Sequence, residues 1–180
     1  MATPEETLRD YNNGLPDGLR RHIERMVEEA LRLAVLGHDI ARAMAPEELL
    51  CLAGELGLSP GDVERAEPTL LHGAIAARLL PERFGVDDPE ILDAVRYHTT
   101  GRAGMSAMEK IVYIADKTEP GGLKWFPEWS EVRDLADRDL DGALLRGLNL
   151  SIERALREGW LLHPDTVAAR NHLLQQRAGR

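Results

Sequence analysis

Cysteine and aromatic residues are both scarce in this chain of 180 residues. The single cysteine, Cys51, excludes an internal disulfide and suits a reducing compartment, and its leucine neighbours predict a buried thiol. Aromatic residues make up 4% of the chain, whereas leucine and alanine dominate. That balance favours helices packed on helices over a β-sandwich, which uses more β-branched and aromatic residues.

Long apolar runs and runs of basic residues are also missing. No stretch approaches the ~20 apolar residues that span a bilayer, and the first ten residues are too acidic and polar for a signal peptide. We therefore expect no membrane partner and a cytoplasmic location. The net charge of −9 disfavours nucleic acid as a partner, because nucleic-acid binding needs a positive surface. An acidic protein that handles phosphates needs local positive charge, and a bound metal is the simplest source.

The chain does contain a succession of helical patterns separated by short breaks. Ser106 and Glu109 have the spacing of a capping box, and Pro46, Pro68 and Pro89 suit the first turns of helices. We expect helices from about residue 19 and over 46–57, 68–84, 89–98, 106–119, about 131–159 and 164–174, with a loop at 123–131. The sequence thus predicts an all-α fold, with one domain over 1–180 and a loose segment at 1–14.

Histidines and aspartates stand out within these helical patterns. Asp116 lies in the apolar stretch IVYIADK, where a buried carboxylate is costly unless it meets a cation. His38-Asp39, His72 and His98 fall on other predicted helices, and imidazole with carboxylate suits a divalent first-row metal such as iron or manganese. Such a metal activates water and neutralises phosphoryl oxygens.

Each of these residues also has an ordinary structural interpretation. A lone helical histidine is more often a packed or surface residue, and Asp116 could pair with Lys110 or Lys117. Spacing alone leaves a metal site and these structural roles equally open. We expect His163 and His172 to be surface residues without a functional role.

Two longer stretches resemble a known family. Residues 68 to 120 contain PTLLHGAIAARLL and DDPEILDAVRYHTTGRAGMSAMEKIVYIADKTEPG, and HDIA begins at position 38. Together with EVRDLADRDLDGALLRGLNLSIERALREGWLLHPDTVAARN, they closely resemble the YqeK-like branch of the HD-domain phosphohydrolases. The resemblance covers roughly residues 15 to 174, and YHTTG followed by MSxxEKxxYxAD goes well beyond the HD pair.

The resemblance implies an all-α HD-domain helical bundle that binds one or two divalent metal ions, often iron, with manganese or cobalt as alternatives. It also implies an enzyme that hydrolyses diadenosine tetraphosphate symmetrically to two ADP. Carried onto this chain, the core metal ligands are His38, Asp39 and Asp116, and His72 and His98 support a second metal. The expected phosphate contacts are Thr99, Thr100, Gly101 and Lys117, and the expected catalytic residues are Asp39 and Lys117.

One feature departs from the family. HD proteins use a further histidine on an earlier helix, and the matching residue here is His22, only 16 positions before His38. In a continuous helix these positions are about 24 Å apart, so both could not bind one metal within one chain. Three alternatives follow: a tight break in the helix near Gly37, an exchanged helix in a homodimer, or a site that lacks this ligand.

Three functions therefore compete. The first is symmetrical hydrolysis of diadenosine tetraphosphate, and the second is the same chemistry on another nucleotide. The third is a nucleotide-binding or partner-binding protein whose metal site has degraded. The segment 123–129 could be a lid over the substrate or a partner surface, although core packing explains its aromatic residues more simply.

Overall fold

The computed structural model describes residues 17–179, without the side chains of residues 17–25, 121, 122 and 125. The predicted loose segment 1–14 lies outside the described residues. Within this range helix is the sole regular secondary structure, so the predicted all-α class is confirmed. The α-helices are α2 (Asp17–Gly37), α3 (Pro46–Glu55), α4 (Asp62–Ala66), α5 (His72–Phe84), α6 (Pro89–Tyr97), α7 (Ala107–Thr118), α8 (Pro120–Trp125), α9 (Ser130–Ala136), α10 (Leu140–Glu158) and α11 (Pro164–Ala178). Two 3₁₀ helices, η1 (Pro68–Leu71) and η2 (Pro127–Trp129), connect them.

Local capping sets where these helices begin. At α7 the Ser106 hydroxyl accepts from the Glu109 amide at 3.2 Å, and the Glu109 carboxylate accepts from the Ser106 amide at 2.7 Å. This confirms the predicted capping box. At α10 the Asp139 carboxylate accepts from the Gly142 amide at 2.8 Å. That cap divides the predicted helix 131–159 into α9 and α10.

The segment 123–129 is largely helical and not the predicted loop. Pro120 ends α7 but also occupies the first position of α8, where its missing amide N–H costs no hydrogen bond. Trp129, at the end of η2, is buried in the core, and Leu123 and Phe126 pack against that core. Core packing thus explains much of the aromatic content of this segment.

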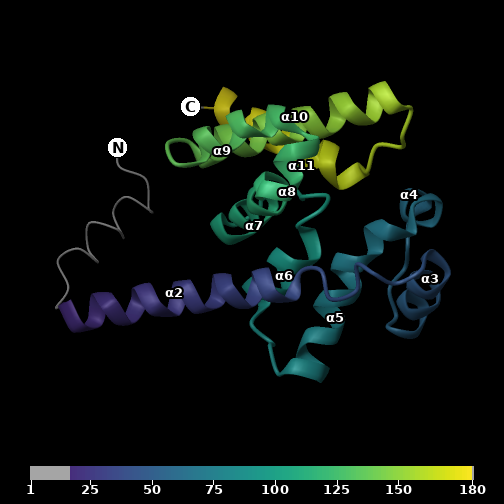
Figure 1. Ribbon diagram of the computed structural model, residues 1–180, viewed down its shortest axis with the longest axis horizontal. Coiled ribbons are helices and arrows are strands. Elements are labelled where there is room, and N and C mark those ends of the chain that lie inside the picture. Colours follow the sequence, from purple (N-terminus) through teal and green to yellow (C-terminus); the bar gives the residue numbers. More distant parts are fainter. Residues whose placement is uncertain (1–16, 180) are drawn as a thin grey trace.

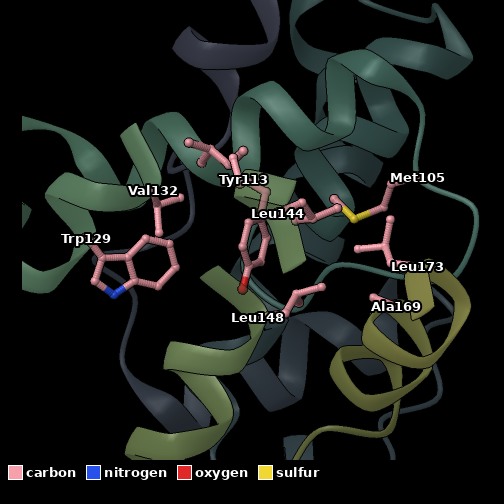
Figure 2. Close-up of a cluster of buried hydrophobic side chains, with 10 residues drawn as sticks. Met105, Tyr113, Trp129, Val132, Leu144, Leu148, Ala169 and Leu173 are labelled. Atoms are coloured by element: carbon pink, nitrogen blue, oxygen red, sulfur yellow. The ribbon is translucent and has the colours of Figure 1, made fainter. Parts of the chain in front are cut away.

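The helices form two groups joined through α7 (Figure 1). On one side α10 packs on α9, α11 and α7, and on the other α6 packs on α5, α7 and α2. The first group encloses the core cluster in Figure 2. Its members are Met105, Tyr113, Ile114, Trp129, Val132, Ala143, Leu144, Leu148, Ala169 and Leu173. A second cluster fills the space between α2, α5, α6 and α7, and a third lies under α3.

The predicted burial of Cys51 is wrong, because its side chain is exposed. Leu49 and Ala53 form the buried face of α3, and Cys51 lies two positions from each of them. Two residues rotate a helix by about 200°, so Cys51 points to the opposite face. Its thiol lies 3.7 Å from Glu55 Oε1.

No helix in the described range is long and apolar enough to cross a membrane.

Candidate metal centre

The ends of four helices bring the predicted ligands together. His38 and Asp39 lie in the turn that follows α2, and His72 is the first residue of α5. His98 is the C-cap of α6, and Asp116 lies in the last turn of α7. Residues spread over nearly 80 positions thus meet at one place.

All three histidines are oriented in the same way. Nδ1 of His38 lies 2.7 Å from the Val35 carbonyl, and Nδ1 of His98 lies 2.7 Å from the Val95 carbonyl. His72 Nδ1 makes the same bond to the carbonyl of Thr69, also three residues earlier. A carbonyl oxygen only accepts, so each Nδ1 carries the proton and each Nε2 presents a lone pair when the ring is neutral. Histidines that ligate metals are held in this way.

The three Nε2 atoms converge with two carboxylates. His72 Nε2 lies 2.9 Å from His98 Nε2 and 3.2 Å from Asp39 Oδ1. His38 Nε2 lies 3.5 Å from Asp39 Oδ2 and 3.5 Å from Asp116 Oδ1. One oxygen of Asp39 therefore faces His38, and the other faces the His72–His98 pair.

These neighbouring donor atoms repel each other unless a cation lies among them. With their Nδ1 protons committed to carbonyls, His72 and His98 direct two lone pairs at each other and at Asp39 Oδ1. His72 and His98 are 1% exposed, so water cannot relieve this repulsion. The donor set of imidazole nitrogens and carboxylate oxygens fits a divalent first-row cation.

Burial keeps two of the imidazoles neutral. It lowers the pKa of His98 to about 3 and also lowers the pKa of His72. A hydrogen bond to Asp116 raises the pKa of His38 against the opposing effect of burial. Burial alone would raise the pKa of Asp116, but the hydrogen bond from His38 and the charge of Lys117 hold it well below its usual range. The centre thus combines two neutral imidazoles, those of His72 and His98, with an ionised carboxylate, and metals require these protonation states of their ligands.

Two triads in this cluster have the spacing of a metal site. In the triad of His38, His98 and Asp116, and in that of Asp39, His72 and His98, the donor atoms lie within 4.8 Å of one another. Ligands on opposite sides of a metal are about 4 Å apart when each bond is near 2.1 Å. His98 belongs to both triads, so a displacement of its imidazole would disturb either set of donor atoms.

Lys117 lies directly beside the cluster. Its Nζ donates to the His98 carbonyl at 2.8 Å and to Asp116 Oδ2 at 3.3 Å. The pairing of Lys117 with Asp116, one of the ordinary roles considered for this aspartate, is therefore present, and Asp116 faces His38 as well. Burial lowers the pKa of Lys117. The ammonium group also lies 3.9 Å from the centre of the Tyr113 ring.

The three residues Thr99, Thr100 and Gly101, expected to contact phosphate, lie differently relative to a cleft beside the cluster. The Thr99 hydroxyl lies 3.1 Å from His98 Nε2, and Thr99 lines this cleft. Thr100 and Gly101 do not line this cleft. The Thr100 hydroxyl donates to the Gly101 carbonyl at 3.0 Å, and Gly101 has a left-handed φ of 68° that turns the chain after α6. A Cβ at Gly101 would lie 3.3 Å from Met105 Sδ. Thr100 and Gly101 therefore shape the turn.

The cleft has a volume of about 780 Å³, and four of the five clustered residues line its wall: Asp39, His72, His98 and Asp116. Its lining includes three cationic residues, Arg42, Lys117 and Arg154, and the half-exposed ring of Trp160. Arg42 lies three residues after Asp39 in the turn that follows α2, a spacing that could have indicated it from the sequence. The sequence did not indicate Arg154 and Trp160, because only tertiary packing brings α10 to this cleft.

His163 and His172 differ from each other. His172 bonds to Gln176 and lies apart from the cluster. His163, in contrast, lines the cleft and is largely buried, contrary to its predicted surface position. Its Nδ1 accepts from the Asp165 amide at 3.1 Å, so Nε2 carries the proton that it donates to Glu64 Oε1 at 3.1 Å. This bond joins the start of α11 to α4.

The side chain of His22 lies outside the described residues. Its backbone belongs to α2, which runs without a break from Asp17 to its end at Gly37. The rise of this helix separates positions 22 and 37 by about 22 Å, so the helix end at Gly37 does not bring position 22 back toward His38. Within one chain, position 22 is therefore remote from the cluster.

Comparisons with known proteins agree with this fold. The profile of the HD domain family matches residues 8–121, more than half of the chain, which places the protein in the HD-domain class. Symmetrical bis(5'-nucleosyl)-tetraphosphatase of Halalkalibacterium halodurans is 37% identical over 82% of this chain and 77% of its own length. The protein of the same name in Bacillus subtilis is 35% identical over 79% of this chain and 75% of its own length.

A solved structure extends the likeness to nearly the whole chain. The crystal structure of a predicted HD superfamily hydrolase involved in NAD metabolism from Clostridium acetobutylicum is 33% identical, with a TM-score of 0.75. The match covers 98% of this chain and 99% of that one. The chain therefore belongs to the HD-domain family, in the branch that contains the symmetrical bis(5'-nucleosyl)-tetraphosphatases.

Proposed function

We propose that this protein is a metal-dependent phosphohydrolase that cleaves diadenosine tetraphosphate symmetrically into two ADP. One observation carries the proposal: His38, His72 and His98 each commit Nδ1 to a carbonyl and direct Nε2 toward two carboxylates in the wall of a large cleft. The names of the curated relatives supply the substrate, since they act on bis(5'-nucleosyl) tetraphosphates symmetrically.

We propose that His38, Asp39, His72, His98 and Asp116 hold one or two divalent ions, with iron as the first choice and manganese or cobalt as alternatives. When bound, such an ion lowers the pKa of water toward neutrality and neutralises charge on phosphoryl oxygens. The burial of His72 and His98 fixes their orientation, so the donor atoms need little rearrangement to bind it.

The reaction forms a bond from a water oxygen to one of the two central phosphorus atoms. The bridging oxygen between these phosphorus atoms then leaves with the other ADP. Asp39 is the residue that we assign to orient the water and accept its proton, since its carboxylate faces all three imidazoles and lines the cleft.

Lys117 and Arg42 bind the phosphates in this proposal. Two of the three N–H groups of Lys117 are taken by His98 and Asp116, which leaves one for a phosphoryl oxygen. Arg42 lines the cleft and has no ion pair within the described part of the chain. Thr99 adds a hydroxyl beside His98. Thr100 and Gly101 do not line the cleft, so we assign them no phosphate contact.

Product analysis tests the proposal. We expect purified protein supplied with iron, manganese or cobalt to release only ADP from diadenosine tetraphosphate, and a strong chelator to abolish the release. AMP and ATP as products would exclude symmetrical cleavage. A panel of deoxynucleotides, cyclic nucleotides and guanosine polyphosphates, assayed under the same conditions, separates this substrate from other nucleotides.

The continuity of α2 favours a second candidate, a nucleotide-binding protein with a degraded metal site. In that case one ligand position of the family is remote from the cluster, and metal content stays well below one ion per chain. An exchanged α2 in a homodimer remains a prediction, as does a cytoplasmic location. Sedimentation of the purified protein tests the homodimer.

A further inference from the structure

One part of the cleft wall has features that the hydrolytic centre does not use. Phe126, just before η2, Arg154 on α10, and Trp160, just after α10, all line the same cleft as the ligand cluster. The guanidinium carbon of Arg154 lies 3.9 Å from the centre of the Phe126 ring and 4.8 Å from the centre of the Trp160 ring. The cation thus contacts both aromatic rings.

Arg154 is held without a carboxylate partner. Among the described residues it makes no ion pair, although its guanidinium is always charged. Neither aromatic ring offers a carboxylate, so the N–H groups of the guanidinium remain able to donate to a ligand. An arginine held in this way is suited to a phosphate group that enters the cleft.

Trp160 presents a large aromatic surface in the cleft. Its side chain is 55% exposed, whereas Trp129 is buried. Its backbone is fixed, because Gly159 adopts φ 70° at the end of α10 and the Trp160 amide donates to the Ala155 carbonyl at 2.8 Å. A half-exposed indole on a fixed backbone in a ligand cleft can stack on a planar base.

The position of Phe126, Arg154 and Trp160 along the cleft fits the length of the tetraphosphate chain. Tyr113 contacts Lys117, and its hydroxyl lies 3.2 Å from Ser151 Oγ, so Ser151 lies close to the ligand cluster. Arg154 is one turn further along α10, roughly 5 Å. Symmetrical cleavage breaks the central bond of the tetraphosphate, so two phosphates separate each nucleoside from the reacting bond. A base subsite must therefore lie away from the ligands, along the cleft.

We propose that Phe126, Arg154 and Trp160 form the subsite for one adenosine of the substrate, with the base stacked on Trp160 and the adjacent phosphate bound by the edge of Arg154. This inference rests on the proposed function for the identity of the substrate. It assigns to these three residues the recognition of a nucleoside, whereas the imidazole and carboxylate cluster handles the central phosphates.

Kinetics with manganese-loaded protein test the subsite. Stacking on an aromatic side chain contributes about 1–3 kcal/mol per base, so Trp160→Ala should raise KM for diadenosine tetraphosphate roughly 5- to 150-fold with little change in kcat. Trp160→Phe should restore most of the affinity. Leu156→Ala, an exposed residue of α10 that does not line the cleft, should leave KM unchanged.

A ligand that has phosphates but no base separates phosphate binding by Arg154 from base stacking on Trp160. Inorganic tripolyphosphate should inhibit Trp160→Ala as well as it inhibits the wild type, but it should inhibit Arg154→Ala more weakly. The matched control is Arg157→Ala, an arginine on the same helix that pairs with Glu158 and lies outside the cleft lining. A KM for Trp160→Ala within twofold of wild type would overturn the subsite while leaving the proposed function intact.

Calorimetric binding of ADP gives an independent readout without turnover. We expect the wild type to bind ADP at least fivefold more tightly than Trp160→Ala. If the wild type binds ADP at least fivefold more tightly than Trp160→Ala but does not hydrolyse diadenosine tetraphosphate, the subsite is supported and the proposed function is refuted. Equal binding of ADP by both proteins would overturn the subsite.

Discussion

Gly73→Ala tests whether the orientation of His98 controls the metal centre. Gly73 follows His72 in α5, where this helix meets α6. A Cβ at this position would lie 2.9 Å from the carbonyl oxygens of both Val95 and Arg96 and 3.1 Å from His98 Nδ1. The Val95 carbonyl is the partner of His98 Nδ1, so the added methyl group would push on both ends of the hydrogen bond that orients this imidazole.

The expected magnitude follows from two effects. Backbone carbonyls cannot move aside cheaply, so α5 and α6 must separate, and overpacking of this kind costs about 1–3 kcal/mol of unfolding free energy. Disturbing the partner that orients a ligating histidine lowers metal affinity about 10- to 100-fold. All five proposed ligands stay in the sequence, so the loss would come from geometry alone.

The assay compares manganese titration and urea unfolding of Gly73→Ala with those of the wild type. Gly54→Ala is the matched control, because Gly54 also lies in a helix but has no other atoms within 4 Å of a built Cβ. It should bind metal as the wild type does and gain up to about 1 kcal/mol of stability. If Gly73→Ala has native helical content and binds manganese within twofold of the wild type, the claim that Val95 and Gly73 position His98 is refuted.

Three further predictions concern single side chains. Arg42→Ala should raise KM for diadenosine tetraphosphate about tenfold, from the loss of a charge-assisted hydrogen bond worth about 1.5 kcal/mol, and steady-state kinetics check this. His98→Ala should lower bound metal to less than a tenth of the wild-type content, whereas His172→Ala should not change it, as elemental analysis can establish. Burial raises the pKa of Tyr113 from 10.0 to about 12, so only the unfolded state loses this proton as the pH rises above 10. Unfolding free energy should therefore fall by about 2 kcal/mol between pH 10 and pH 12 in the wild type, and urea titrations should show a smaller fall in Tyr113→Phe.

Local sequence was enough to predict much of the fold. The capping box at Ser106 and Glu109 depends on residues three positions apart, and the structure contains both of its hydrogen bonds. The ligand candidates were predictable for a different reason. Asp116 lies in an apolar helix, where an isolated carboxylate is costly, and the structure brings it to His38.

Residues that depend on long-range packing escaped prediction. Glu64 and His163 are 99 positions apart, and their hydrogen bond exists because α4 and the start of α11 meet at the cleft. Arg154 and Trp160 enter the same cleft through the packing of α10 on α7. Cys51 shows the converse error, since its two leucine neighbours indicated burial although the helical period turns it outward.

Elemental analysis of the purified, folded protein after loading with iron or manganese is the most direct test of the proposed metal site. If His38, Asp39, His72, His98 and Asp116 converge on a cation, the wild type should retain at least one metal ion per chain after gel filtration. A content well below one ion per chain, in protein with native helical content, would contradict that claim.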